Sequence, residues 1–247
     1  MSTSQRVRIA TYNVHKCEGM DGRTSAGRIA EVIAECSPDV IGLQEVLSLE
    51  EGGFERNQAE FLADRLGMHL AMGDVRRLRG GLYGNIVLSR LPLRGHCKFD
   101  LSVPGREQRG CVRTDVDLGI ARPLHLFNFH LGTAFLERRK QAKLIFESKI
   151  VKDPDLEGPR VVVGDFNEWT RGMVSRALAA EFRGADIRLH LKGRRTYPGF
   201  LPVLHLDHIY YDEDLVLERV SLHRTRKSVV ASDHLPLVAD FAVKSEL

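Results

Sequence analysis

Cysteine is scarce in this sequence, and long apolar runs are missing from it. The four cysteines, Cys17, Cys36, Cys97 and Cys111, show neither CxxC nor zinc-ribbon spacing, which argues against a disulfide scaffold or a structural zinc domain. No uncharged apolar run approaches the ~20 residues that span a bilayer, and the start MSTSQRVRIA lacks the apolar core of a secretory signal. We therefore expect a cytoplasmic protein with free thiols and no transmembrane segment.

The sequence also lacks a strong charge of either sign. Its net charge is +3, and its pI of about 8.7 stays below the value of roughly 9 that marks a basic nucleic-acid footprint. Apolar residues make up 43% of the chain and charged residues 28%, as in ordinary globular proteins. Basic clusters such as RRLR at 76–79 and RRK at 138–140 are most simply solvated faces. The single Trp169 is expected to be a half-buried packing residue, and stacking on a base or a lipid tail is the less favoured alternative.

Apolar runs bounded by turn residues alternate with helical patterns along the chain. A β-α-β opening and further β-rich and helical segments follow from this spacing. The expected strands are 7–14, 39–46, 68–73, 82–90, 95–103, 109–118, 122–131 and 160–166, and the expected helices are 24–36, 54–66 and 134–150. The middle strands are typical of antiparallel meanders. Because no linker or composition break interrupts the chain, we expect residues 1–247 to form one domain with two packed sheets.

Polar residues gather where the apolar strands end. The acids, amides and histidines at these ends are Asn13, Glu45, His130, Asp165, Asn167, Asp207, Asp233 and His234. Any one of them alone is ordinary, because a carboxylate after a strand is commonly a cap or turn former. Together they form a set rich in hard oxygen ligands, which suits Mg²⁺, or Mn²⁺ as a second candidate, better than closed zinc coordination. A zinc site built from His205 and His208 together with His223 or His130 is the less favoured alternative.

These residues belong to an ordered set of motifs that resembles a known superfamily. The motifs are TYNVH, LQEV, GNIVLSRLP, NFHLGT, GDFN, LDHIY and SDHLPL, and they run from residue 11 to residue 237. The set is similar to that of the endonuclease/exonuclease/phosphatase superfamily. The residues of GNIVLSRLPL and NFHLGT resemble the sphingomyelinase-like and general bacterial branch more than exonuclease III. The resemblance implies a four-layered α/β sandwich, with two mixed, mainly antiparallel sheets face to face and helices outside. It also implies metal-dependent hydrolysis of a phosphoester.

The resemblance assigns a metal side and a water side to the expected site. Glu45 would be the principal metal ligand, with Asn13 beside it and Asp233 near the same ion. Asp165 would position or deprotonate the attacking water, and Asn167 would hydrogen-bond that water or a phosphate oxygen.

The resemblance also assigns groups to the phosphate. His234 would contact it, oriented by Asp207, and His130 would be a second histidine reaching towards the phosphate or the leaving group. Arg109 would be a further phosphate ligand. One departure is that the DNase branch pairs its second histidine with a glutamate near residues 76–85, where this chain has no acid.

The resemblance leaves the substrate open. Nucleic acid and a phospholipid headgroup are both candidates, as are sphingomyelin-type lipids and inositol or other small phosphate esters. A catalytically silent binding scaffold is the alternative outside enzymes. We expect a monomer.

Overall fold

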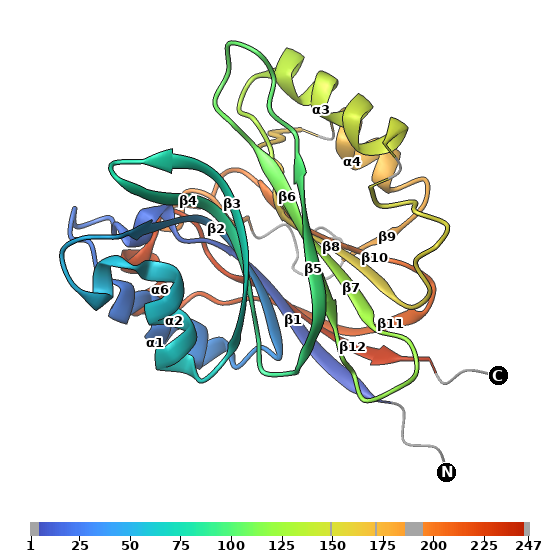
Figure 1. Cartoon of the computed structure of the whole chain (residues 1–247), viewed down its shortest axis with the longest axis horizontal. Coiled ribbons are helices and arrows are strands. Elements are labelled where there is room, and N and C mark those ends of the chain that lie inside the picture. Colours follow the sequence, from blue (N-terminus) through green and yellow to red (C-terminus); the bar gives the residue numbers. More distant parts are fainter. Residues whose placement is uncertain (1–4, 149, 171, 186–194, 245–247) are drawn as a thin grey trace.

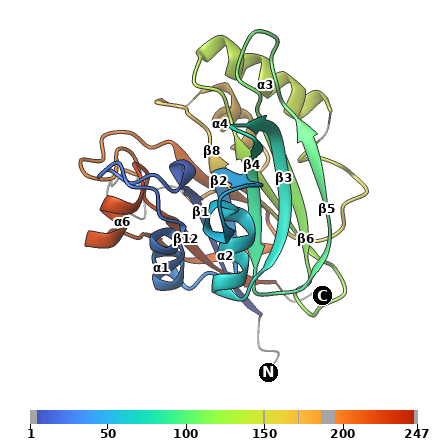
Figure 2. The ribbon, with the colours of Figure 1, turned by 60° about the vertical axis from the view of Figure 1, so that its left-hand side comes forward.

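The molecule consists of two facing β-sheets with helices on their outer surfaces (Figures 1 and 2). The structure is a computed structural model that describes residues 5–148, 150–170, 172–185 and 195–244. Each sheet contains six of the described strands. This is the expected four-layered α/β sandwich. In the ranges described, no helix is long and apolar enough to cross a membrane.

The first sheet combines the N-terminal and C-terminal parts of the chain. Its strands, in spatial order, are β11 (Leu215–Leu222), β12 (Leu237–Val243), β1 (Arg6–Asn13), β2 (Val40–Leu49), β4 (Gly81–Ser89) and β3 (His69–Leu78). Only the central pair β1–β2 is parallel among these neighbours, and the other pairs are antiparallel.

The second sheet comes from the middle of the chain. Its strands, in order, are β5 (Leu93–Asp100), β6 (Gly110–Val116), β7 (Leu124–His130), β8 (Arg160–Asp165), β10 (Asp207–Tyr211) and β9 (Arg183–Gly184). Again the central pair, β7–β8, is parallel and its neighbours are antiparallel. Both sheets are therefore mixed and mainly antiparallel, as the sequence predicts.

Helices complete the two outer layers. On the first sheet lie α1 (Ala26–Cys36), α2 (Gln58–Leu66) and α6 (Arg226–Ala231), and on the second lie α3 (Phe135–Glu147) and α4 (Met173–Leu178) (Figure 1). Apolar clusters fill all three spaces between the layers. Local chemistry sets the helix ends: Ser25 caps α1 by accepting a hydrogen bond from the Arg28 N–H, and Gly67 ends α2 with φ +62°.

Several boundaries differ from those expected. The helix at 54–66 is split into a 3₁₀ turn (Phe54–Arg56) and α2, and the helix at 134–150 ends at Glu147. The strand expected to end at residue 46 continues to Leu49, because a bulge between Leu43 and Val46 lets β2 bend without ending. β11, α4 and α6 are elements that the apolar pattern does not reveal.

A layer of buried amides joins the two sheets near the end that carries the polar residues. Gln44 Nε2 donates to Asn128 Oδ1 at 2.6 Å, and Asn128 Nδ2 donates to the carbonyls of Leu43 and Ile86, each at 2.9 Å. A Cβ on Gly42 would lie 2.8 Å from the Asn128 side chain, so glycine permits this approach. The amides thereby fix the register of β2 against β7, next to Glu45 and His130.

Candidate active site

The polar residues expected to form a site come together at one edge shared by both sheets. Asn13, His130 and Asp165 are the last residues of β1, β7 and β8, and Asp207 is the first residue of β10. His130 and Asp165 are register partners, as are Asp165 and Asp207, so three side chains of the second sheet stand in a row. His234 joins them from the segment between α6 and β12.

Asn13 links the two sheets through its side-chain amide. Its Nδ2 donates to Glu45 Oε1 at 3.1 Å and to Asp165 Oδ2 at 3.0 Å. Its Oδ1 accepts from the His15 N–H at 3.0 Å. One amide thus holds two carboxylates close together, although its oxygen points away from Glu45. An ion at Glu45 would meet the nitrogen of Asn13 in this arrangement, not its oxygen.

Glu45 is an ionised carboxylate in a largely buried place. It lies at the bulge of β2 with φ +58°, a backbone conformation that non-glycine residues rarely adopt. Burial alone would raise the pKa of Glu45. The charge that His130 carries at acidic pH, the charge of Lys16 and the hydrogen bond from Asn13 outweigh burial and lower the pKa to about 2. Lys16 Nζ donates to Glu45 Oε2 at 3.1 Å.

Asp165 is at the centre of the cluster. It is 1% exposed, and its Oδ2 lies 3.7 Å from Nε2 of both His130 and His234. Its Oδ1 accepts from the Asn167 N–H at 2.9 Å. Burial raises the pKa of Asp165, and the nearby Asp207 raises it further, while the two histidines pull it down. A raised pKa favours the uptake of a proton by this carboxylate.

His234 and Asp207 form a buried ion pair. His234 Nδ1 donates to Asp207 Oδ2 at 2.9 Å, and both residues are buried. Burial alone would lower the pKa of His234, but the charges of Asp207 and Asp165 outweigh it and raise the pKa to about 10. His234 is therefore an imidazolium at neutral pH. The Tyr197 ring packs on it, with 4.8 Å between ring centroids.

His130 has the opposite protonation state. Burial and the positive charge of Arg109 lower the pKa of His130 to about 4, against the pull of Asp165 and Glu45. Arg109 Nη1 lies 3.0 Å from His130 Nδ1 and 3.2 Å from His130 Nε2, so a neutral imidazole offers this guanidinium a lone pair. His130 Nε2 also lies 3.7 Å from Asp165 Oδ2. Arg109 replaces the acid that the DNase branch would supply, and it is itself bonded to Glu107 at 2.7 Å.

Asn167 and Asp233 lie less centrally than expected. Asn167 Nδ2 donates to the Leu131 carbonyl at 2.9 Å, so its amide nitrogen fixes the turn after β8. Asp233 is partly exposed, with Oδ1 3.8 Å from His15 Nδ1 and 3.3 Å from Ser232 Oγ. Ser232 in turn donates to the backbone carbonyl of Asn13 at 2.8 Å. Asp233 thus reaches the cluster through neighbours.

The cluster suits a hydrated magnesium ion better than a zinc ion. In the part of the chain that the structure describes, no three histidine, cysteine or acid side chains are grouped so as to hold a metal. Mg²⁺ keeps several waters and commonly uses one or two carboxylates, of which Glu45 is one candidate, whereas closed zinc sites need four protein ligands. The rings of His205 and His208 are tilted by 35° with 4.2 Å between their centroids, and the described residues group no third metal ligand with them.

Lys16, Tyr197 and Ser232 are site residues that the sequence analysis missed. Ser232 stands directly before the DH pair of SDHLPL, and that position is the signal that could have found it. Lys16 reaches Glu45 only because His15, Lys16 and Cys17 all have positive φ values, which no glycine or proline announces. Tyr197 lies in the described segment before β10, where the Leu204 N–H donates to the Tyr197 carbonyl at 2.8 Å and the Leu235 N–H donates to the Thr196 carbonyl at 3.0 Å.

Two facing mixed sheets with acids, amides and histidines at a shared edge define a DNase I-like α/β sandwich, the fold of a class of phosphoester hydrolases. The chain belongs to the Endonuclease/Exonuclease/phosphatase family, whose model matches residues 10–234. Over 246 residues it is 31% identical to YbhP, an uncharacterized protein of Escherichia coli K12, covering 94% of this chain and 95% of that relative.

Solved structures share the fold at lower sequence identity. An endonuclease/exonuclease/phosphatase from Beutenbergia cavernae has a TM-score of 0.75 at 22% identity, covering 98% of this chain and 72% of that one. A mannosyl-6-phosphatase from Bacteroides thetaiotaomicron has a TM-score of 0.73 at 18% identity, covering 96% of this chain and 99% of that one. At these identities the likeness concerns the fold.

Proposed function

We propose that this protein is a divalent-metal-dependent phosphodiesterase whose single domain spans residues 1–247. The observation that carries the proposal is the buried cluster in which Asp165 lies 3.7 Å from both an imidazolium, His234, and a neutral imidazole, His130. Two groups of opposite protonation state around one carboxylate are suited to proton transfer at a phosphoester. Mg²⁺, with Mn²⁺ as second candidate, would be held by Glu45, with Asn13 and Asp233 nearby.

Asp165 is the base in this proposal. A metal ion at Glu45 would supply Lewis-acid stabilisation of the phosphoryl oxygens. Asp165 orients the attacking water and takes its proton, because burial raises the pKa of this carboxylate. The Asn167 N–H donates to Asp165 Oδ1 and leaves Oδ2 on the side of the two histidines. The side-chain oxygen of Asn167 would be the group available to the water or the phosphate.

The imidazolium of His234 stabilises the charge that develops on the phosphate. Asp207 holds the ring through Nδ1, so Nε2 is the nitrogen that donates to a phosphoryl oxygen. His130 lies next to the Asp165 carboxylate, and Arg109 holds its imidazole ring in place. The Arg109 guanidinium adds positive charge close to the phosphate.

Hydrolysis of bis-p-nitrophenyl phosphate in the presence of Mg²⁺ tests the proposal. Glu45→Gln, Asp165→Asn and His234→Gln should each lower turnover at least ~10²-fold, because each removes a charge or a proton acceptor from the reaction centre. Glu218→Gln is the control, since Glu218 pairs with Arg6 in an exposed salt bridge on the first sheet. Wild-type rates in all three site variants would refute the proposal.

A further inference from the structure

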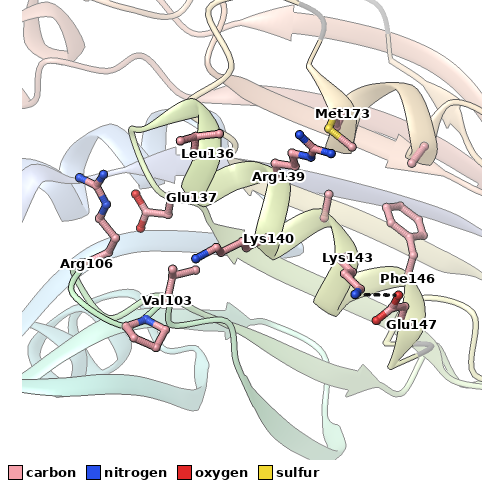
Figure 3. A pocket seen from close by; sticks show the side chains of 13 residues that line it. Val103, Arg106, Leu136, Glu137, Arg139, Lys140, Lys143, Phe146, Glu147 and Met173 are labelled. Atoms are coloured by element: carbon pink, nitrogen blue, oxygen red, sulfur yellow. Dashed lines mark ion pairs between the residues drawn. The ribbon is translucent and has the colours of Figure 1, made fainter.

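A groove lies beside the proposed catalytic centre, between the loop after β5 and helices α3 and α4 (Figure 3). Its volume is about 910 Å³, within the upper range of pockets that bind small molecules. None of the residues discussed in the catalytic cluster lines it. The groove is therefore a separate feature that the proposed reaction does not use.

The lining of the groove is mainly apolar. Val103, Ala142 and Phe146 line it, and Leu136 and Met173 add apolar side chains from α3 and α4 (Figure 3). Leu136 is 64% exposed and Met173 43% exposed, so both leave apolar surface uncovered. Contiguous exposed apolar surface of this kind marks a binding site more often than a lone apolar residue does.

Cations border this apolar surface. Arg106, Arg139 and Lys140 line the groove and form no ion pair with any residue that the structure describes, whereas Lys143 pairs with Glu147 at 3.7 Å. Glu137 is buried in the same wall, and its Oε1 has no hydrogen-bond partner among the described residues. Three unpaired cations beside apolar surface are complementary to an anionic amphiphile.

The groove is fixed to the strands that carry part of the catalytic cluster. The Leu101 N–H donates to the Arg109 carbonyl at 2.9 Å, and this closes the loop that contains Val103 and Arg106. Gln141 of α3 accepts from the Gly132 N–H at 2.9 Å and donates to the Leu101 carbonyl at 3.2 Å. The loop and helix α3 that border the groove are thus tied to the backbone on either side of Arg109 and His130.

Two exposed aromatic residues are close in the sequence to residues that line the groove. Phe135 precedes Leu136 and is 61% exposed, and Trp169 stands four residues before Met173 and is 68% exposed. The expectation that Trp169 is a half-buried packing residue is therefore wrong.

We propose that this groove binds an acyl chain of an anionic phospholipid, with the lipid phosphate at Arg106, Arg139 and Lys140. Single-stranded nucleic acid is the less suitable occupant, because bases need flat aromatic platforms, and Phe146 is the one aromatic side chain among the lining residues described. The aliphatic lining suits a flexible hydrocarbon chain. The cations explain a preference for an anionic headgroup over a zwitterionic one.

Sedimentation with vesicles tests this site without any turnover. The full chain carrying Asp165→Asn is mixed with phosphatidylcholine vesicles or with vesicles containing 30% phosphatidylglycerol, and the bound fraction is measured in the presence of EDTA. We expect binding to the anionic vesicles only, with a change in the fluorescence of Trp169, the single tryptophan of the chain. Absence of binding to anionic vesicles would overturn the proposal.

Variants locate the binding surface. Leu136→Asp with Met173→Asp, and separately Arg139→Glu with Lys140→Glu, should each weaken vesicle binding at least ~10-fold, since each pair removes apolar burial or charge attraction. Leu144→Asp is the matched control, because Leu144 is on the same helix and 38% exposed but does not line the groove. Equal losses in the control would overturn the proposal, as would displacement of the protein from vesicles by a single-stranded oligonucleotide at equal phosphate concentration.

The vesicle result and the hydrolysis result are independent. If anionic vesicles bind through the groove but bis-p-nitrophenyl phosphate is not hydrolysed, the lipid site stands and the proposed phosphodiesterase activity fails. If bis-p-nitrophenyl phosphate is hydrolysed but anionic vesicles do not bind, the phosphodiesterase activity stands and the lipid site fails.

Discussion

At the scale of the residue, the most consequential feature is a set of charges buried where water cannot solvate them. Asp207, Asp165 and His234 are all almost fully buried and lie within 4 Å of a partner of opposite charge. Removing the partner of any one of them would destabilise the folded protein, because a buried charge has lost its hydration and needs an opposite charge nearby. The imidazolium of His234 is therefore kept by the two acids, and its proton becomes part of the stability of the fold.

A pH dependence follows from this pair. The pKa of His234 is about 10 in the folded protein, against about 6.5 in an unfolded chain, so its contribution to stability is complete below pH 6.5 and is lost as the pH rises towards 10. His234→Gln should flatten that part of the profile, and Asp207→Asn should do the same because the partner charge is gone. Urea unfolding between pH 6 and 10 measures the effect.

The difference between the profiles isolates His234, because buried thiols such as Cys17, whose pKa burial raises, titrate in wild type and variants alike. Asn57→Ala is the control, because an amide does not titrate and the Asn57 side chain makes no capping bond at α2. It should keep the wild-type slope. A wild-type slope in His234→Gln would mean that His234 is neutral in the folded protein.

At the scale of the element, strands and their ends could be predicted, but their partners could not. Apolar runs indicate each strand of the two central parallel pairs, and the polar residues at Asn13, His130 and Asp165 stand at strand ends as expected. Sheet membership is different, since β3–β4 and β5–β7 follow one another in sequence yet belong to opposite sheets. Pairing is decided by contacts between distant segments, which a local pattern does not contain. The bulge at Glu45 and the positive φ of Lys16 are hidden for the same reason.

The buried amide layer is the element-scale device that holds the sheets in register. Asn128→Ala would leave the carbonyls of Leu43 and Ile86 and the amide of Gln44 without their partners. We expect a loss of about 2–4 kcal/mol in the free energy of unfolding, because several buried polar groups are stranded at once. Urea denaturation measures this loss. Asn57→Ala is the control, since the Asn57 side chain makes no capping bond at α2, and its change should stay within about 0.5 kcal/mol. Equal changes in both variants would contradict this role of the layer.

At the scale of the whole molecule, the proposed site belongs to neither sheet alone. Glu45 and Asn13 come from the first sheet, whereas Asp165 and His130 come from the second, and the Asn13 amide joins them across the interface. A ligand bound between these groups holds the two halves of the sandwich together, so binding is coupled to global stability. Lys16 takes part in this coupling, because its ammonium group donates to one oxygen of Glu45.

Magnesium should therefore raise the melting temperature of the protein. At a concentration of 100 times its Kd, a ligand specific for the folded state adds about 2.7 kcal/mol, or roughly 5–10 °C for a chain of this length. Differential scanning fluorimetry in a Mg²⁺ series, with EDTA as reference, measures the shift. Glu45→Gln should abolish it, while Lys16→Met should reach the same shift at lower Mg²⁺, because no side-chain cation then competes for the carboxylate. Glu218→Gln should respond like wild type. A Mg²⁺ shift that survives in Glu45→Gln would place the ion elsewhere and remove the metal from the proposed mechanism.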